Sequence, residues 1–297
     1  MSHAIDRLAD LDRLTLHVRR GMGDRPGDRR FPGRPQPSGI EVEGHSLYAP
    51  GDDLRHIDWN AVGRLDALLV RRFTAEREVT VHLLLDASAS MAVPARDRKL
   101  AVAAELARAL AYLALAANDA VRLAVLAGEA PPRLGPVFRQ RASVMRVAKL
   151  LDAVAACGQL ALGAALEAYA RQFAKPGVAI VISDLMAEPA EIERGLLALR
   201  ARRYEVILLQ VLGRAELEPE RDFSSGLLRD VESGETHPIE LGADALTRYR
   251  ALLDGHLSAL AALAARFEAT YARLVTGASV HDFVAVELAR LGVVKRR

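Results

Sequence analysis

The sequence predicts an α/β fold in which helices cover both faces of a doubly wound, mostly parallel sheet, with a small β-rich segment before it. Three observations predict this class. The 297 residues are 51% hydrophobic and 26% charged, which is enough to bury a sizeable core. The predicted strands are continuous apolar runs, as is typical of strands buried on both faces. Helical segments separate them, which indicates parallel connections.

The first 78 residues divide into two regions. Residues 4–18 carry apolar side chains at helical spacing and predict a short amphipathic helix. Residues 19–37 are dense in arginine, glycine and proline, and predict a linker, so that 1–37 form a helix and linker. Residues 38–78 predict a small β-rich segment, with a turn at 48–53 and an apolar strand near 68–73.

From residue 79 to 297 strands and helices alternate, which predicts one α/β domain. The expected strands are 79–85, 120–127, 177–182, 205–212 and 271–275. The expected helices are 97–117, 142–156, 162–173, 188–201, 243–267 and 280–291. A hairpin insertion is expected near 227–239, around the Ser233–Gly234 turn.

Composition excludes several classes. The net charge of +2 argues against a surface built wholly for nucleic acid, and leaves the arginine-rich linker as the one candidate basic arm. The single cysteine, Cys157, predicts a buried, inert thiol. The N-terminus has no apolar signal-like run, and the apolar stretch at 99–117 carries charges, so we expect a cytoplasmic protein without a membrane span. No P-loop motif is present, which argues against ATPase activity of the chain itself.

Polar side chains follow two of the predicted strands. Asp86, Ser88 and Ser90 come at alternate positions after the strand at 79–85, and Asp184 follows the strand at 177–182. Ligands of doubly wound sheets bind at the carboxyl ends of strands, so these oxygens are expected to converge on one crevice. Such a donor set suits a hard divalent cation. The alternative is that Asp86, Ser88 and Ser90 only shape a turn and cap the next helix.

This pattern resembles the metal-ion-dependent adhesion site of von Willebrand factor A domains. The resemblance implies that Ser88 and Ser90 bind Mg²⁺ or Mn²⁺ directly, and that Asp86 and Asp184 act through water and hydrogen bonds. It also implies that a partner's carboxylate takes the open position on the metal. In that family a threonine completes the site, and Leu160 holds its place here.

A second motif covers more of the chain. The run Tyr48-x-Pro-Gly-Asp-Asp-x-Arg-x-Ile-Asp-Trp59, the segment 70–76 and the strand with its DxSxS loop are similar to domain-of-unknown-function family 58. The resemblance implies a bacterial protein with a von Willebrand A-like core. It also implies a MoxR-type AAA+ ATPase as partner, working with this chain in the maturation or remodelling of a client protein.

The charged run inside that motif has two interpretations. We expect a structural clasp that pins the β-rich segment to the α/β domain, with Trp59 burying its ring. Its members are Tyr48, Asp52, Asp53, Arg55, Asp58 and Trp59. The alternative is a metal-dependent hydrolase that uses Asp52, Asp53, His56 and Asp58. The favoured hypothesis is a non-enzymatic adaptor for protein–protein interaction.

Overall fold

A computed structural model describes residues 10–17, 40–50, 54, 57–65, 67–75, 79–128, 131–172, 177–221, 224–231 and 234–296. These residues divide into two compact units. One contains 40–75, and the other contains 10–17 together with 79–296. The arginine-rich linker expected at 19–37 lies outside the described residues.

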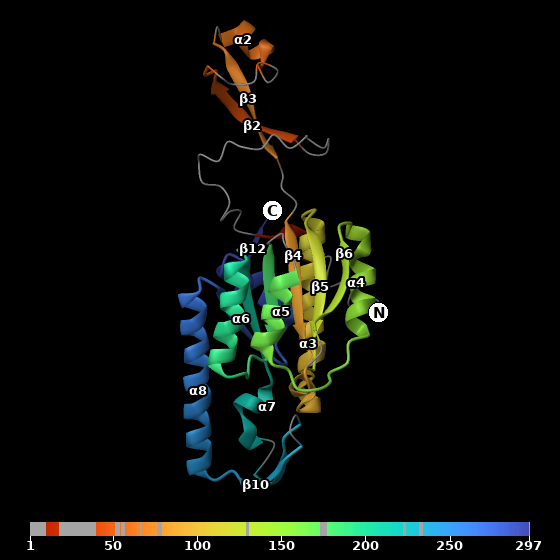
Figure 1. Ribbon diagram of the computed structural model, residues 1–297, viewed down its shortest axis with the longest axis vertical. Coiled ribbons are helices and arrows are strands. Elements are labelled where there is room, and N and C mark those ends of the chain that lie inside the picture. Colours follow the sequence, from red (N-terminus) through yellow and green to blue (C-terminus); the bar gives the residue numbers. More distant parts are fainter. Residues whose placement is uncertain are drawn as a thin grey trace. The chain divides into compact units, whose positions relative to one another are not determined.

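Among the described residues, six strands form the central sheet of the larger unit, in the order β11-β8-β7-β4-β5-β6 (Figure 1). All neighbours are parallel except β5 and β6. The strands are β4 (Thr80–Asp86), β5 (Ala120–Leu126), β6 (Arg133–Phe138), β7 (Val178–Ser183), β8 (Glu205–Leu212) and β11 (Thr270–Val275). The antiparallel edge strand β6 was not expected, because Gly135 and Pro136 interrupt its apolar pattern.

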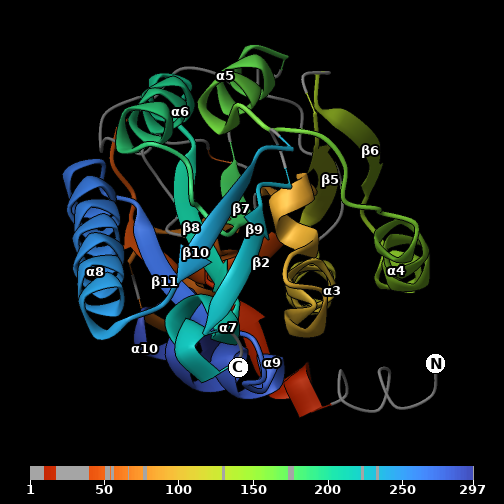
Figure 2. The same cartoon turned by 90° about the horizontal axis from the view of Figure 1, so that it is seen from below.

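Helices cover both faces of this sheet, as predicted (Figure 2). One face packs against α3 (Lys99–Ala116), α4 (Val144–Asp152) and a C-terminal helical segment. The other packs against α5 (Leu162–Gln172), α6 (Pro189–Ala201) and α8 (Ala243–Arg266). The C-terminal segment consists of α9 (Val280–Asp282), the π-helical η7 (Phe283–Glu287) and α10 (Leu288–Arg290).

Strand β4 shows why its sequence is an unbroken apolar run. Leu83 and Leu85 belong to the core beneath α3, and Leu84 belongs to the core on the opposite face. His82 points to that second face as well, and is 2% exposed between the rings of Tyr169 and Tyr204. The strand therefore has no solvent side, and its first carboxylate comes only at its end, at Asp86.

The N-terminal expectation of a helix over 4–18 is wrong where the structure describes it. Asp10–Arg13 form a 3₁₀ turn, η1, and Leu14–Leu16 form β1. Strand β1 pairs antiparallel with β12 (Val294–Arg296), close to the other end of the chain. Leu14 and Leu16 both bury their side chains, so tertiary pairing overrides the helical spacing of the local sequence.

Short helical elements lie at the edge of the sheet where β4, β7 and β8 end. They are η3 (Ala89–Ala92), η4 (Ala95–Asp97), α7 (Arg214–Leu217) and η6 (Pro219–Arg221). The expected hairpin follows them as β9 (Ser225–Arg229) and β10 (Thr236–Glu240), paired antiparallel. A 3₁₀ turn, η5 (Arg141–Ser143), precedes α4. No helix in the described part of the chain is long and apolar enough to cross a membrane.

The smaller unit is built on the antiparallel pair β2 (Ile40–Leu47) and β3 (Leu69–Ala75). A register shift between Val42 and Gly44 marks an irregularity in β2. The connection between the strands contains α2 (Trp59–Leu65). The sequence predicted the β-rich character of this segment, and the short helix was not expected.

Candidate functional site

The site lies where the winding of the sheet changes direction. From β4 the chain continues to β5 on one side, and it later returns to place β7 on the other side. Leu85 of β4 and Ile182 of β7 are register partners, so Asp86 and Ser183 end adjacent strands. This reversal is the place where doubly wound sheets leave a crevice at their carboxyl edge.

The oxygens of the DxSxS loop converge, as predicted. Asp86 Oδ1 accepts hydrogen bonds from the backbone N–H of Ser88 at 2.8 Å and from Ser88 Oγ at 2.7 Å. The Oγ atoms of Ser88 and Ser90 lie 2.9 Å apart. Asp86 Oδ2 accepts a hydrogen bond of 2.6 Å from Ser183 Oγ at the end of β7. Asp86 and Ser88 are buried, whereas Ser90 is partly exposed at the surface.

Burial and charge perturb this carboxylate. Burial raises the pKa of Asp86 to about 6, and the nearby carboxylate of Asp184 acts in the same direction. The hydrogen bonds from Ser183 and Ser88 oppose the rise. Asp86 is therefore a negative charge held in a place that favours a compensating cation.

Asp184 lies close enough to Asp86 to raise its pKa, but the Asp184 side chain makes its own hydrogen bond to Lys99. Its Oδ2 accepts a hydrogen bond of 3.0 Å from Lys99 Nζ, and its Oδ1 accepts one of 3.3 Å from the Met186 backbone. Gln210 Nε2 donates to the backbone carbonyl of Asp184 at 2.8 Å. The next residue, Leu185, has a φ of 52°, a strained conformation for a leucine that turns the chain sharply after β7.

Lys99 is the functional-site residue that sequence reasoning missed. It is the first residue of α3 and is only 1% exposed. Its Nζ donates to Asp184 and, at 2.5 Å, to Glu216 Oε1 of α7. Burial acts to lower the pKa of Lys99, but the carboxylates of Asp184 and Glu216 outweigh it and raise the pKa above its usual value. A fixed positive charge therefore sits beside Asp184.

Part of the site suits a divalent cation. Asp86, Ser88 and Ser90 present carboxylate and hydroxyl oxygens of the kind that Mg²⁺ prefers. Among the described residues, no three His, Cys, Asp or Glu side chains gather as metal ligands, so a cation here would depend on the two hydroxyls. Leu160 provides no oxygen and packs against the core of the α5 face. Both oxygens of Asp184 already accept hydrogen bonds, one from Lys99 and the other from the Met186 backbone N–H.

The loop that carries Leu160 lies beside the DxSxS loop. Ala89 N–H donates to the carbonyl of Gly158 at 2.9 Å, and Cys157 N–H donates to the carbonyl of Ala87 at 2.9 Å. Gly158 has a φ of 69°, which favours glycine at this turn. Cys157 is exposed, so the expectation of a buried thiol is wrong, because the loop places it at the surface.

The candidate clasp is described only in part. Asp52, Asp53, Arg55 and His56 lie outside the described residues, so neither the clasp nor the hydrolase is tested there. The Tyr48 backbone N–H donates to the carbonyl of Leu68 at 2.8 Å, and its side chain is half-buried.

Asp58 and Trp59 lie at the start of α2. The Asp58 carboxylate bonds His45 Nε2 at 2.8 Å and accepts the backbone N–H of Asn60 and Ala61 at 3.1 and 3.3 Å. It therefore caps this helix. Trp59 begins this seven-residue helix, none of whose side chains is buried, and the expected packing of its ring against the α/β domain stays a prediction.

The family described as "Protein of unknown function DUF58" matches residues 45–254. The chain belongs to this family. Uncharacterised proteins of Mycobacterium bovis and Mycobacterium tuberculosis are 33% identical over 227 residues, covering 72% of this chain. The chain spans 62% of the length of these curated relatives.

Solved structures with a similar arrangement come from Bacteroides. A conserved hypothetical protein, BatB, from Bacteroides thetaiotaomicron is 19% identical, with a TM-score of 0.47 over 72% of this chain and 98% of that chain. An aerotolerance-related membrane protein from Bacteroides fragilis is 18% identical, with a TM-score of 0.45 over the same shares.

Proposed function

We propose that this DUF58 protein is a non-enzymatic adaptor that recognises another protein at the carboxyl edge of its sheet. The observation that carries this proposal is the convergence of Asp86, Ser88 and Ser90 at the point where the winding reverses. Two hydroxyls and one carboxylate supply only one negative charge, so a divalent cation held there keeps affinity for an external carboxylate.

In this proposal Ser88 and Ser90 hold Mg²⁺ or Mn²⁺, and Asp86 orients them from behind. When bound there, the cation would supply a Lewis-acidic site for a partner's carboxylate. Asp86 Oδ1 fixes the Ser88 hydroxyl by the 2.7 Å contact, and Ser183 fixes the other oxygen of Asp86. Lys99 keeps Asp184 in place and limits the negative charge of the site.

The proposed partner is the MoxR-type AAA+ ATPase that the family resemblance implies, with a client protein matured or remodelled in the cytoplasm. In this division of work the ATPase supplies energy and this chain supplies recognition. The engagement of Asp58 as a helix cap supports the adaptor over the hydrolase, because the hydrolase would need that carboxylate free for chemistry.

The test is capture of the purified cognate ATPase by the immobilised protein, with Mg²⁺ or with EDTA. Asp86→Asn keeps the shape and the Oδ1 acceptor while removing the charge. Asp254→Asn, an exposed aspartate of α8, is the matched control. Capture that falls with EDTA and with Asp86→Asn, but not with Asp254→Asn, supports the proposal. Capture that ignores both EDTA and Asp86→Asn contradicts its metal-dependent form, and no capture at all contradicts the partner.

A further inference from the structure

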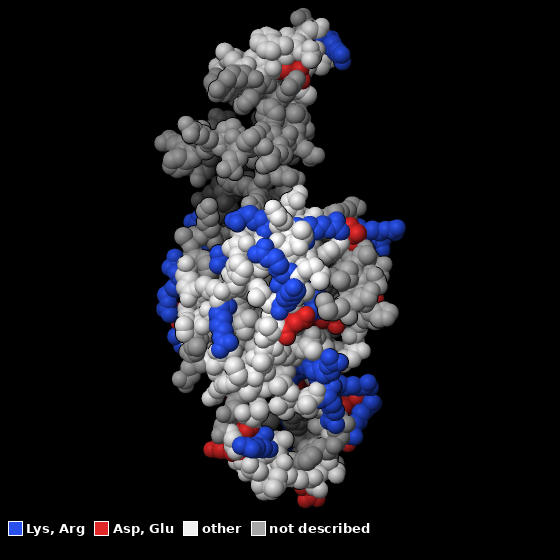
Figure 3. Space-filling view, turned by 90° about the vertical axis from the view of Figure 1, so that its right-hand side faces the viewer, with Lys and Arg blue, Asp and Glu red and all other residues white. Residues whose placement is uncertain are grey.

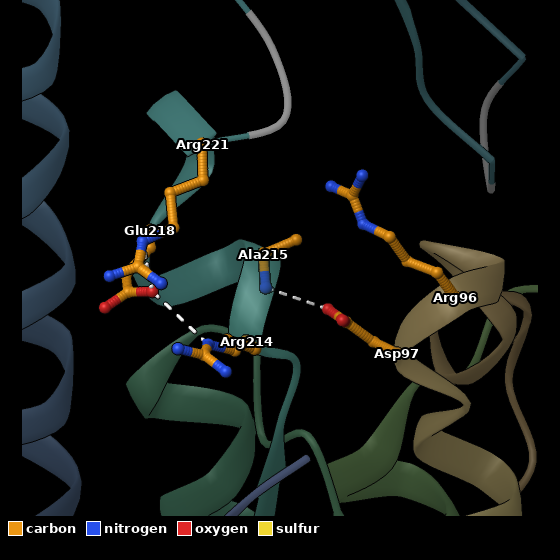
Figure 4. A pocket seen from close by; sticks show the side chains of 6 residues that line it. All are labelled: Arg96, Asp97, Arg214, Ala215, Glu218 and Arg221. Atoms are coloured by element: carbon orange, nitrogen blue, oxygen red, sulfur yellow. Dashed lines mark hydrogen bonds and ion pairs between the residues drawn. The ribbon is translucent and has the colours of Figure 1, made fainter. Parts of the chain in front are cut away.

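A pocket of about 270 Å³ opens at the carboxyl edge between η4 and the segment formed by α7 and η6 (Figure 4). It is separate from the DxSxS loop, whose Asp86, Ser88 and Ser90 do not line it. The described residues that line it are Arg96, Asp97, Arg214, Ala215, Glu218 and Arg221.

The two walls of this pocket are fixed to each other. Asp97 Oδ2 accepts the backbone N–H of Ala215 at 2.9 Å, across the pocket from η4 to α7. Gly213 permits this approach, because a Cβ there would lie 2.3 Å from Asp97 Oδ2. Lys99 of α3 also links the two segments, because its Nζ binds Glu216 Oε1 of α7 at 2.5 Å. The pocket is therefore formed before any ligand arrives, which lowers the entropic cost of binding.

The charges of the pocket favour one carboxylate. Arg214 and Arg221 lie on either side of Glu218, at 3.3 and 2.9 Å, and share its single charge. Figure 4 shows Arg96 reaching from the opposite wall into the space before α7. Among the described residues that line the pocket, three guanidinium groups outnumber the two carboxylates of Asp97 and Glu218 by one. A singly charged carboxylate balances this excess, whereas a phosphate dianion would exceed it beside two resident carboxylates.

A groove with both apolar and charged lining residues continues from the pocket. A second cavity, of about 830 Å³, shares Arg96 and Asp97 with it and runs along α3. Met91, which follows Ser90 in the chain, is among its lining residues, and Leu100 and Ala101 contribute apolar surface. Figure 3, which views the molecule from the side of β6 and α4, shows more basic than acidic side chains on the larger unit. The field on this side therefore attracts an acidic segment.

We infer that the Arg96–Arg214–Arg221 pocket binds an acidic side chain of a partner protein, with an adjacent apolar side chain of that partner in the groove along α3. The inference rests on the proposed adaptor role and adds the chemistry of the segment that is recognised. Binding here uses guanidinium groups and needs no metal.

The test uses a fluorescein-labelled, end-capped octapeptide in which glutamate and leucine alternate, titrated with the full chain in EDTA and followed by anisotropy. The comparison peptide has glutamine in place of every glutamate. Arg96→Ala and Arg214→Ala are compared with Arg171→Ala. Arg171 is a matched control, because it pairs with Glu167 at i,i+4 and its side chain is 62% exposed, the same as Arg214 with Glu218.

We expect the glutamate peptide to bind more tightly than the glutamine peptide, and Arg96→Ala and Arg214→Ala each to weaken it about tenfold. Arg171→Ala should leave its affinity unchanged. Equal binding of both peptides, equal effects of all three substitutions, or no binding up to about 1 mM peptide overturns the inference.

The two proposals fail separately. If the peptide does not bind but Asp86→Asn still abolishes capture of the ATPase, only the arginine pocket is lost. If the peptide binds through Arg96 and Arg214 while the ATPase is not captured, the acid-binding pocket stands and the proposed partner falls.

Discussion

Replacing Lys99 with methionine tests the charge arrangement on which the carboxyl edge depends. The substitution keeps the length and apolar stem of the side chain but removes the ammonium group from between Asp184 and Glu216. Lys99 is 1% exposed, and the side chains of its two partners are 5% and 20% exposed. Because two carboxylates lose their buried partner, we expect Lys99→Met to lower the free energy of unfolding by about 3–5 kcal/mol at neutral pH.

A second substitution separates lost charge from lost packing. In Lys99→Met/Glu216→Gln one of the two uncompensated charges is removed, so part of the lost stability should return. Lowering the pH should likewise restore part of the stability that Lys99→Met loses. A carboxylate without its cation has a folded-state pKa above its unfolded value, so the deficit of Lys99→Met should be largest at neutral pH and shrink as the pH falls toward 5.

Urea unfolding at pH 7.5 and at pH 5 measures both effects, with Arg171→Met as an exposed control. The control should change stability by less than about 0.5 kcal/mol. A loss below about 1 kcal/mol for Lys99→Met, or no recovery on adding Glu216→Gln, would show that this ion pair does not carry the charge balance inferred from its burial.

Three further predictions follow from single contacts. Burial lowers the pKa of His82 from 6.5 to about 4, so neutral His82 contributes stability above pH 6.5 that is lost as the pH falls toward 4. Between these two pH values the free energy of unfolding of the wild type, measured in urea, should fall by about 3 kcal/mol relative to that of His82→Leu. Parallel pH profiles of the two proteins would refute this. Gly213→Ala should lower the free energy of unfolding by about 1–3 kcal/mol, because the added Cβ meets Asp97. Gly255→Ala has open space around it in α8 and should raise the free energy of unfolding by up to about 1 kcal/mol. Thermal unfolding that ranks the two variants the other way contradicts the packing argument. Asp58→Ala should weaken the start of α2 by about 1 kcal/mol, measured as faster hydrogen exchange of the first amides of that helix, and unchanged exchange would exclude the cap.

The central sheet could be predicted because most of its strands are recognisable from their own amino-acid sequence. Buried parallel strands need apolar side chains on both faces, so β4, β7 and β8 are visible as uninterrupted runs. The convergence of Asp86 and Asp184 on one edge followed from the same signal, since parallel strands end on the same side. The pairing of β1 with β12 could not be found, because three-residue strands at the two ends of the chain have no local pattern.

The charged contacts at the carboxyl edge could not be predicted from local sequence, because they join residues far apart in the chain. A lysine in the first turn of a helix is normally solvated. Lys99 is buried because Asp184 and Glu216, 85 and 117 residues further along the chain, meet it in the fold. The arginine pocket has the same origin, since Arg96 and Arg214 belong to connections after different strands. Such sites depend on tertiary placement, and the nearest sequence signal is a charged residue directly after a buried strand.

Hydrogen–deuterium exchange with and without the proposed MoxR-type ATPase is the most direct test of recognition at the carboxyl edge. We predict slower exchange in 86–98 and 213–221, the segments around the DxSxS loop and the arginine pocket, and no change in α5 on one face of the sheet. Slower exchange confined to α5 and α6, with 86–98 and 213–221 unaffected, would place recognition elsewhere and contradict the account.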